Sequence, residues 1–126
     1  MNDEIVEIYE KEGMNELIDK IRNLDFNGLG KSEHFLYSVD EKNTDIEMLR
    51  TNFKDFSKIK LIQKRKHRAG KSSYDFYYEL EDRTYVIYSI AFEGKPILIN
   101  GFHVRRNFEH FKKVLTRAYK DKLMGH

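Results

Sequence analysis

One short segment of the sequence combines a side chain that can move protons with side chains that bind phosphate. Residues 101–106 read GFHVRR, so His103 is followed closely by Arg105 and Arg106. Histidine titrates near neutral pH and can take up and release a proton during a reaction, and arginine holds phosphate oxygens through paired N–H donors. With Arg83 from an earlier turn, these residues form a candidate catalytic site for cleaving RNA without a metal, with the ribose 2′-hydroxyl as nucleophile. The alternative is a histidine at the start of a helix and arginines that are merely exposed.

A second candidate site is the most basic stretch of the chain, residues 58–71, which contains no acidic residue. A basic strand end beside tyrosines suits contact with an RNA backbone together with stacking on its bases. We therefore assign nucleic-acid binding to Lys64, Arg65, Lys66, His67, Arg68 and Lys71. The competing interpretation, a hairpin loop that its lysines keep solvated, stays open at this point. We also expect His103 and either Arg105 or Arg106 to lie close to Arg83 or His67 across the surface of the sheet.

Charge is divided unevenly along the chain, although the net charge is only +2. Residues 1–55 hold 7 Lys and Arg against 14 Asp and Glu, a balance of −7, and residues 56–126 hold 16 against 7, a balance of +9. This division indicates either a basic surface for a polyanion or two halves that neutralise each other in the fold. Under the first interpretation, residues 58–71 and 105–117 share one positive surface.

Other kinds of chemistry find little support in the sequence. The histidines show no spacing typical of a metal site, and there is no P-loop, GxGxxG or GxSxG motif. The absence of cysteine excludes disulfides and thiolate ligands. We therefore expect neither a metal nor a cofactor. Because we find no signal-peptide pattern and no apolar run approaching 18 residues, we expect a cytoplasmic protein without a membrane segment.

The N-terminal part of the chain predicts a strand followed by a helix. Residues 4–9 (EIVEIY) have the composition of a short strand, and residues 14–24 carry apolar side chains at helical spacing. A glycine inside a helix costs about 1 kcal/mol relative to alanine, so Gly13 favours a break between the two elements. One long helix across both segments is the alternative.

The next segment predicts a loop and then a second helix. Residues 25–40 include two glycines and read as a loop, with a short strand at residues 35–39. Thr44 followed by Glu47 is a capping-box pattern, in which each side chain satisfies a free backbone N–H at a helix start.

The C-terminal part predicts four strands and a closing helix. Short turns separate the strands, which implies antiparallel pairing. We expect the strands at residues 59–66, 74–80, 84–92 and 97–102, and the helix at residues 104–123. The helix is amphipathic and basic, with a buried stripe that begins at Val104 and Phe108. The fold class is therefore α+β, with one domain over residues 1–126.

Two segments resemble the RelE/HigB toxin superfamily, especially its phage-associated branch. They are the opening VEIYEKEGMNELIDKI and the later YVIYSIAFEGKPILINGFHVRR, which ends in Gly-Phe followed by basic residues. The resemblance implies a RelE-like fold, with a short N-terminal strand, two helices, a four-stranded antiparallel meander and a C-terminal amphipathic helix. It also implies an RNA-cleaving toxin that cuts mRNA freely or on the ribosome, and a paired antitoxin protein.

Two functions therefore remain open from the sequence. The first is the endoribonuclease toxin, whose partners would be RNA or the ribosome and an antitoxin, with no membrane involved. The second is a non-enzymatic binding or inhibitor protein of a phage or mobile element, for which the basic and aromatic side chains form an interface without chemistry. Because one fold can host either function, the arrangement of the side chains must separate them.

Overall fold

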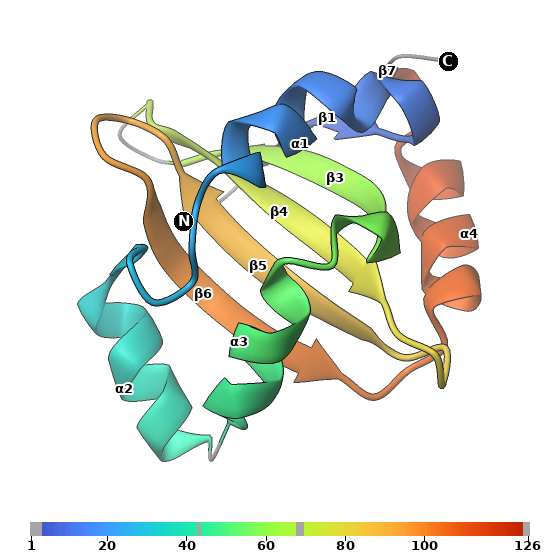
Figure 1. Cartoon of the computed structure of the whole chain (residues 1–126). Coiled ribbons are helices and arrows are strands. Elements are labelled where there is room, and N and C mark those ends of the chain that lie inside the picture. Colours follow the sequence, from blue (N-terminus) through green and yellow to red (C-terminus); the bar gives the residue numbers. More distant parts are fainter. Residues whose placement is uncertain (1–3, 43, 68–69, 125–126) are drawn as a thin grey trace.

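The computed structural model describes residues 4–42, 44–67 and 70–124 of the chain and shows an α+β fold (Figure 1). The strands are β1 (Glu4–Tyr9), β2 (Gly30–Lys31), β3 (Ile59–Lys66), β4 (Ser72–Glu79), β5 (Tyr85–Ala91), β6 (Ile97–Val104) and β7 (Leu123–Met124). The helices are α1 (Asn15–Arg22), α2 (Glu33–Glu41), α3 (Ile46–Phe53) and α4 (Phe108–Ala118), with short 3-10 helices at Lys11–Met14, Phe56–Lys58 and Lys120–Lys122. Among the described residues, no helix is both long and apolar enough to cross a membrane.

All seven strands join one sheet, in the order β2-β6-β5-β4-β3-β1-β7. Strands β3 to β6 form the predicted antiparallel meander, and β1 adds to it antiparallel to β3. The two-residue strands β2 and β7 pair in parallel at the edges. The turn between β5 and β6 contains Gly94 at φ 80°, a conformation that favours glycine. The predicted fold class is confirmed.

Helices α1, α2 and α3 cover one face of the sheet (Figure 1). Alternate residues of β4 and β5 point into this layer, where Phe76, Tyr78 and Tyr88 are fully buried. Phe53 of α3 packs against Tyr88, with ring centroids 5.3 Å apart. Burying each such side chain stabilises the fold by about 1.5–3 kcal/mol. Gly101 lets α2 approach β6 closely, because a Cβ there would lie 3.2 Å from the Phe35 ring.

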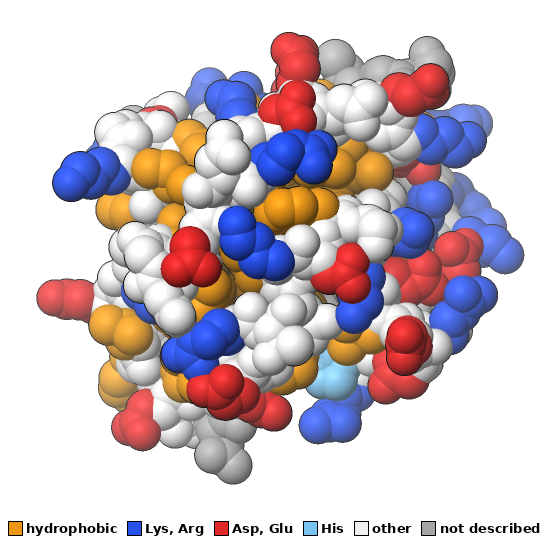
Figure 2. Space-filling model, viewed as in Figure 1, with side chains coloured by type: hydrophobic (Ala, Val, Ile, Leu, Met, Phe, Trp, Pro, Cys, Tyr) orange, Lys and Arg blue, Asp and Glu red, His pale blue; other side chains and the backbone are white. Residues whose placement is uncertain are grey.

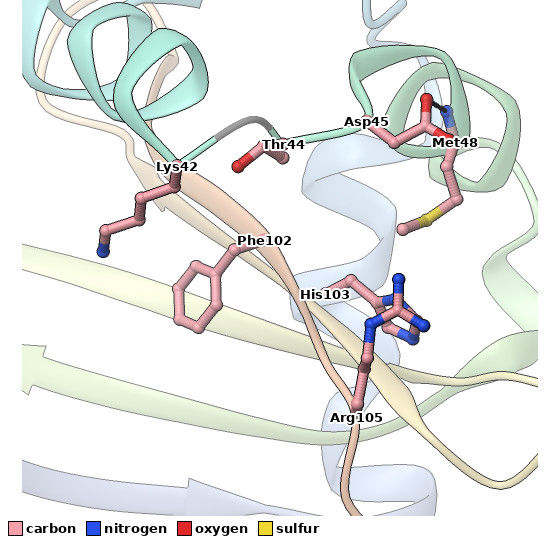
Figure 3. Close-up of a pocket in the computed structure, with 7 residues that line it drawn as sticks. All are labelled: Lys42, Thr44, Asp45, Met48, Phe102, His103 and Arg105. Carbon is pink, nitrogen blue, oxygen red and sulfur yellow. Dashed lines mark hydrogen bonds between the residues drawn. The ribbon is translucent and has the colours of Figure 1, made fainter.

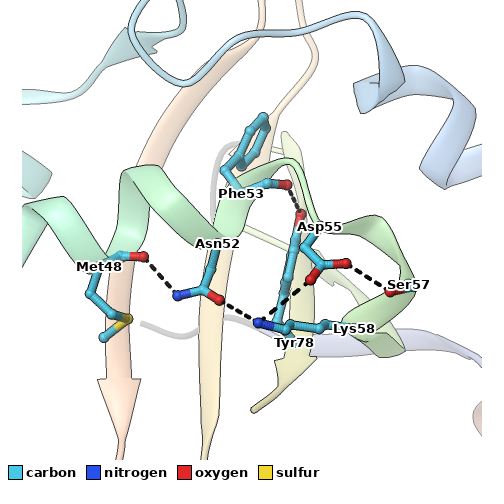
Figure 4. Close-up of polar contacts among 7 residues, drawn as sticks. All are labelled: Met48, Asn52, Phe53, Asp55, Ser57, Lys58 and Tyr78. Carbon is cyan, nitrogen blue, oxygen red and sulfur yellow. Dashed lines mark hydrogen bonds and ion pairs between the residues drawn. The ribbon is translucent and has the colours of Figure 1, made fainter. Parts of the chain in front are cut away.

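The connection between α3 and β3 is held by a chain of polar contacts (Figure 4). The Tyr78 hydroxyl donates to the carbonyl of Phe53 over 2.8 Å, and burial raises the pKa of Tyr78 well above its usual value. Lys58 Nζ donates to Asn52 Oδ1 over 2.8 Å and lies 3.5 Å from Asp55. The first lysine of the basic stretch is therefore engaged within the fold.

Helix α4 covers only part of the opposite face, at one end of the sheet (Figure 1). Its Phe108, Phe111 and Leu115 pack with Tyr77 and Tyr85 of the sheet in a second apolar cluster. The Phe111 ring stacks on both tyrosines, with centroids 5.2 and 5.1 Å away. In the described part of the chain, no helix covers the rest of this face, and a hollow lies there.

The predicted loop at residues 25–40 is wrong in its second half, because α2 occupies it. Ser32 caps this helix by accepting a hydrogen bond from the backbone N–H of Phe35, and its hydroxyl donates to the carbonyl of Ile99. Phe35 and Ser38 are buried three residues apart, as on one face of a helix. The chain therefore has a third helix before the meander, and no strand forms at residues 35–39.

Three predicted element boundaries also need correction. The N-cap of α3 is Asp45 and not Thr44, because the Asp45 carboxylate accepts from the N–H of Met48. Strand β6 continues through Val104, so α4 begins later than predicted, at Phe108. Asn107 caps α4 by accepting from the N–H of His110 over 2.9 Å.

Candidate active site

His103 lies near the end of β6, a strand that pairs with β2 only at its beginning. Its Nε2 is 2.8 Å from the hydroxyl of Thr84, and that hydroxyl is 2.5 Å from Asp82 Oδ1. An ionised carboxylate only accepts hydrogen bonds, so the Thr84 hydroxyl donates to Asp82 and accepts from the Nε2–H of His103. This assignment leaves Nδ1 of a neutral His103 as the nitrogen that can accept a proton.

The chain from Asp82 through Thr84 to His103 has an electrostatic consequence. The Thr84 hydroxyl lowers the pKa of Asp82, with further lowering from the Thr84 backbone N–H and the charge of His103. Asp82, which is exposed, therefore stays ionised, and its carboxylate remains the acceptor that orients the Thr84 hydroxyl toward His103. Such a relay is suited to a general base.

His103 and Arg105 line the same hollow, whose volume is about 450 Å³ (Figure 3). Lys42 and Thr44 form its opposite side, and Asp45 and Met48 of α3 border it. A guanidinium beside an imidazole can hold a phosphate oxygen while the imidazole moves a proton. The hollow therefore joins two residues of the predicted catalytic site.

The other two residues predicted to be catalytic lie elsewhere. Arg83 forms an ion pair with Glu79 over 3.4 Å, and its carbonyl accepts from the N–H of Phe108. Burial raises the pKa of Tyr85, and the charge of nearby Arg106 partly offsets this effect. Neither arginine lines the hollow of His103, because their contacts, Phe108 and Tyr85, belong to the apolar cluster under α4.

The basic stretch at residues 58–71 does not lie on a single surface as predicted, because neighbouring residues of a strand face opposite sides of a sheet. Lys64 lies over the ring of Tyr74, which packs against the core under α1 and α3. Arg65 faces the other side, where it pairs with Asp75. Lys66 and Lys71 are exposed, and Arg68 lies outside the described residues. Figure 2 shows the helix-covered face with basic and acidic side chains interspersed.

Arg65 and His67 come together in a second hollow, on the face that α4 leaves open. His67 is therefore separated by the sheet from His103, and the predicted grouping of these two histidines is wrong. The second hollow also contains Asp75, which sequence reasoning missed. Its signal in the sequence was an acidic residue among the aromatic residues Tyr74, Phe76, Tyr77 and Tyr78.

Among the described residues, no group of three or more His, Asp or Glu side chains is placed to hold a metal ion. No protein-family model, curated protein or solved structure matches the chain. The functional argument therefore depends on the geometry of the two hollows.

Proposed function

We propose that this protein is an RNA-cleaving toxin of a toxin–antitoxin system, an mRNA endoribonuclease that works without a metal. The observation that carries the proposal is the relay from Asp82 through Thr84 to His103, which lines one hollow with Arg105. The relay supplies a base, and the arginine supplies a charge for phosphate. These are the groups that cleavage by the ribose 2′-hydroxyl requires.

In the proposed reaction, Nδ1 of His103 takes the proton of the 2′-hydroxyl. The 2′-oxygen then bonds to phosphorus, and the bond from phosphorus to the 5′-oxygen of the next nucleotide breaks. The products are a 2′,3′-cyclic phosphate and a 5′-hydroxyl, whose oxygen takes its proton from water in the open hollow. Arg105 stabilises the negative charge that develops on the non-bridging oxygens. Asp82 orients the Thr84 hydroxyl toward His103.

The partner surface of this toxin would lie beside the site. Leu36 and Tyr37 are adjacent on α2 and are 51% and 66% exposed, so they offer apolar surface to a partner. Helix α2 leads directly to Lys42 at the rim of the hollow. An antitoxin seated on α2 would therefore lie next to His103, and the ribosome could meet the same surface.

The same exposed residues favour a second candidate function, a non-enzymatic binding or inhibitor protein. In that case Leu36 and Tyr37 would be the centre of the interface, and the relay of His103 would have no catalytic role. The two functions differ in one measurable respect, because only the first predicts broken RNA.

The test is expression of the wild type and of His103→Ala and Arg105→Ala, with growth and RNA cleavage measured with and without ribosomes. Matched controls are His110→Ala and Arg117→Ala, which remove the same residue types from exposed positions on α4. We expect wild-type products with 2′,3′-cyclic phosphate ends, and a loss of about 100-fold or more in His103→Ala. A wild type that leaves growth and RNA intact, with ribosomes present, contradicts the nuclease and favours the binding protein.

A further inference from the structure

The open face of the sheet contains a hollow of about 480 Å³ that lies apart from His103. Arg65, Asp75 and Ser89 reach it from three adjacent strands, and His34 reaches it from α2. The hollow is unusual because charged and polar side chains occupy inward-facing strand positions. Most of the other buried side chains on the two sheet faces are aromatic or aliphatic, with Gln63 as an exception.

Asp75 holds Arg65 in a fixed orientation. The Nε of Arg65 donates to Asp75 Oδ2 over 2.5 Å, and the Ser89 hydroxyl donates to the other carboxylate oxygen over 2.6 Å. Only 5% of the Asp75 side chain is exposed, against 31% for Arg65. Both carboxylate oxygens are thus engaged by protein donors, while the guanidinium is partly accessible from the hollow.

The ion pair of Arg65 with the buried Asp75 is an inefficient way to stabilise the fold. A buried ion pair often contributes less than apolar side chains of similar volume would, because both charges lose their hydration. A rigid guanidinium is instead what recognition of an oxyanion requires, since Arg binds phosphate through several N–H donors in one plane. Burial by itself lowers the pKa of Arg65, but the charge and the hydrogen bond of Asp75 outweigh this effect, so the pKa is raised and the guanidinium stays protonated.

Other groups of the hollow suit a nucleotide. His67 has its Nε2 2.6 Å from the Ser73 hydroxyl, which fixes the ring on the Arg65 side of the hollow. Ile87 and Phe102 provide an apolar wall, and Asn100 lies beside them with an amide that can both donate and accept. Phosphate donors at one end and an apolar wall with one amide at the other match the two ends of a nucleotide.

We propose that this hollow binds the phosphate group of a nucleotide, with Arg65 as its anchor and with Ile87 and Phe102 against the base. The site does not depend on cleavage at His103, because it lies on the other face of the sheet. Its phosphate can belong to a free nucleotide or to a nucleotide within an RNA strand. The chemistry of recognition is the same in both cases.

The experiment follows the backbone amide signals of the protein by NMR during titration with four probes. These are inorganic phosphate, adenosine 5′-monophosphate, adenosine, and a short oligonucleotide with 2′-deoxy sugars that cannot be cleaved by its own 2′-hydroxyl. We expect shifts at Arg65, Ser73 and Ser89 with the three phosphate-bearing probes, and weaker shifts with adenosine. The oligonucleotide and the monophosphate compete, and the tighter of the two identifies the source of the phosphate.

The matched variant is Arg65→Gln with Asp75→Asn, which removes both charges but keeps side chains that can bond to each other. Its control is Lys60→Gln, the loss of one charge from an exposed position of the same strand. We expect the double variant to bind adenosine 5′-monophosphate about 10-fold or more weakly, and Lys60→Gln to bind it as the wild type does. Circular dichroism establishes that both variants are folded. If the double variant is not folded, the same titration is made with Asp75→Asn alone.

The proposal is overturned if no phosphate probe shifts signals at the hollow, or if the double variant binds as tightly as the wild type. A wild type that binds nucleotide here but cuts no RNA contradicts only the nuclease. A wild type that cuts RNA while the hollow ignores phosphate contradicts only the nucleotide site. A protein partner that occupies the hollow in place of phosphate would give the same negative titration and would also overturn it.

Discussion

Replacement of Arg65 by methionine should destabilise the protein strongly, because it leaves the carboxylate of Asp75 without its counter-ion. Asp75 is 5% exposed and would retain the hydrogen bond from Ser89, 2.6 Å away. Removing one partner of a buried ion pair costs about 3–5 kcal/mol. Since 31% of Arg65 is exposed, water can enter in its place, and we expect about 2–3 kcal/mol for this site.

The decisive comparison is with the double variant Arg65→Met, Asp75→Leu. It removes both charges and fills the space with apolar atoms, so its stability should lie within about 1 kcal/mol of the wild type or above it. The free energies of unfolding are measured in urea by circular dichroism, for both single variants, the double variant and Lys60→Met as an exposed control. A coupling energy of about 2 kcal/mol between the two positions is expected.

Two results would refute this reasoning. If Arg65→Met costs less than about 1 kcal/mol, Asp75 is solvated in solution and its burial does not constrain Arg65. If the double variant loses as much as the two single variants together, the pair contributes to stability by itself. The structural reason for assigning it a role in binding would then disappear.

The remaining predictions concern the relay and the core. Thr84→Val removes the hydroxyl between Asp82 and His103. RNA cleavage by this variant should be about 10-fold slower, which corresponds to ~1.4 kcal/mol in the activation free energy. An unchanged rate in an assay with purified protein would show that His103 needs no relay. Because Thr84 lowers the pKa of Asp82, the carboxylate adds stability above its unfolded-state pKa and loses it as the pH falls through the lower folded value. The stability advantage of wild type over Asp82→Asn should thus be full above about pH 5 and vanish in acid, as urea unfolding at several pH values would show. Tyr78→Phe leaves the carbonyl of Phe53 without its donor and should cost about 1 kcal/mol in the same assay, whereas no loss would mean that the 2.8 Å hydrogen bond adds nothing net.

The meander could be predicted from the sequence because its signals are local. Strands β1 and β3 have the bounds that composition and alternation predict, Glu4–Tyr9 and Ile59–Lys66. Short turns between successive strands permit only antiparallel neighbours. The turn between β5 and β6 is also a local signal, because Gly94 readily adopts the positive φ that this turn requires.

Helix α2 could not be predicted in the same way because distant contacts hold it. Its cap, Ser32, donates to the carbonyl of Ile99, which is 67 residues away along the chain. Its buried Phe35 packs against Gly101 of β6, where any larger side chain would come too close to the ring. The packing that stabilises this helix therefore depends on a glycine in a distant strand. Local propensity contains neither fact, and the glycines before the segment suggested a loop instead.

The candidate site was half predictable for a related reason. His103 and Arg105 are two residues apart, so their proximity follows from the sequence. The contact of His103 with Thr84 depends on the pairing of β5 with β6, and the contact of Arg65 with Asp75 depends on the register of β3 and β4. The side chains of β3 alternate between the two faces of the sheet, so residues 58–71 do not form one surface. Only the pairing of β3 with β4 shows that Arg65 is the residue that contacts an acidic side chain, Asp75.

The end of β6 explains how one small sheet can carry two sites with different chemistry. Phe102 and His103 are consecutive residues of a strand, so their side chains leave it on opposite faces. Phe102 borders both hollows, and β2 covers only the beginning of β6. The two hollows therefore share Phe102 as a border, although Arg65 lies on β3, three strands away from β6 in the order of the sheet. The alternation of a single edge strand thus directs two neighbouring side chains to hollows of different composition on opposite faces of the sheet.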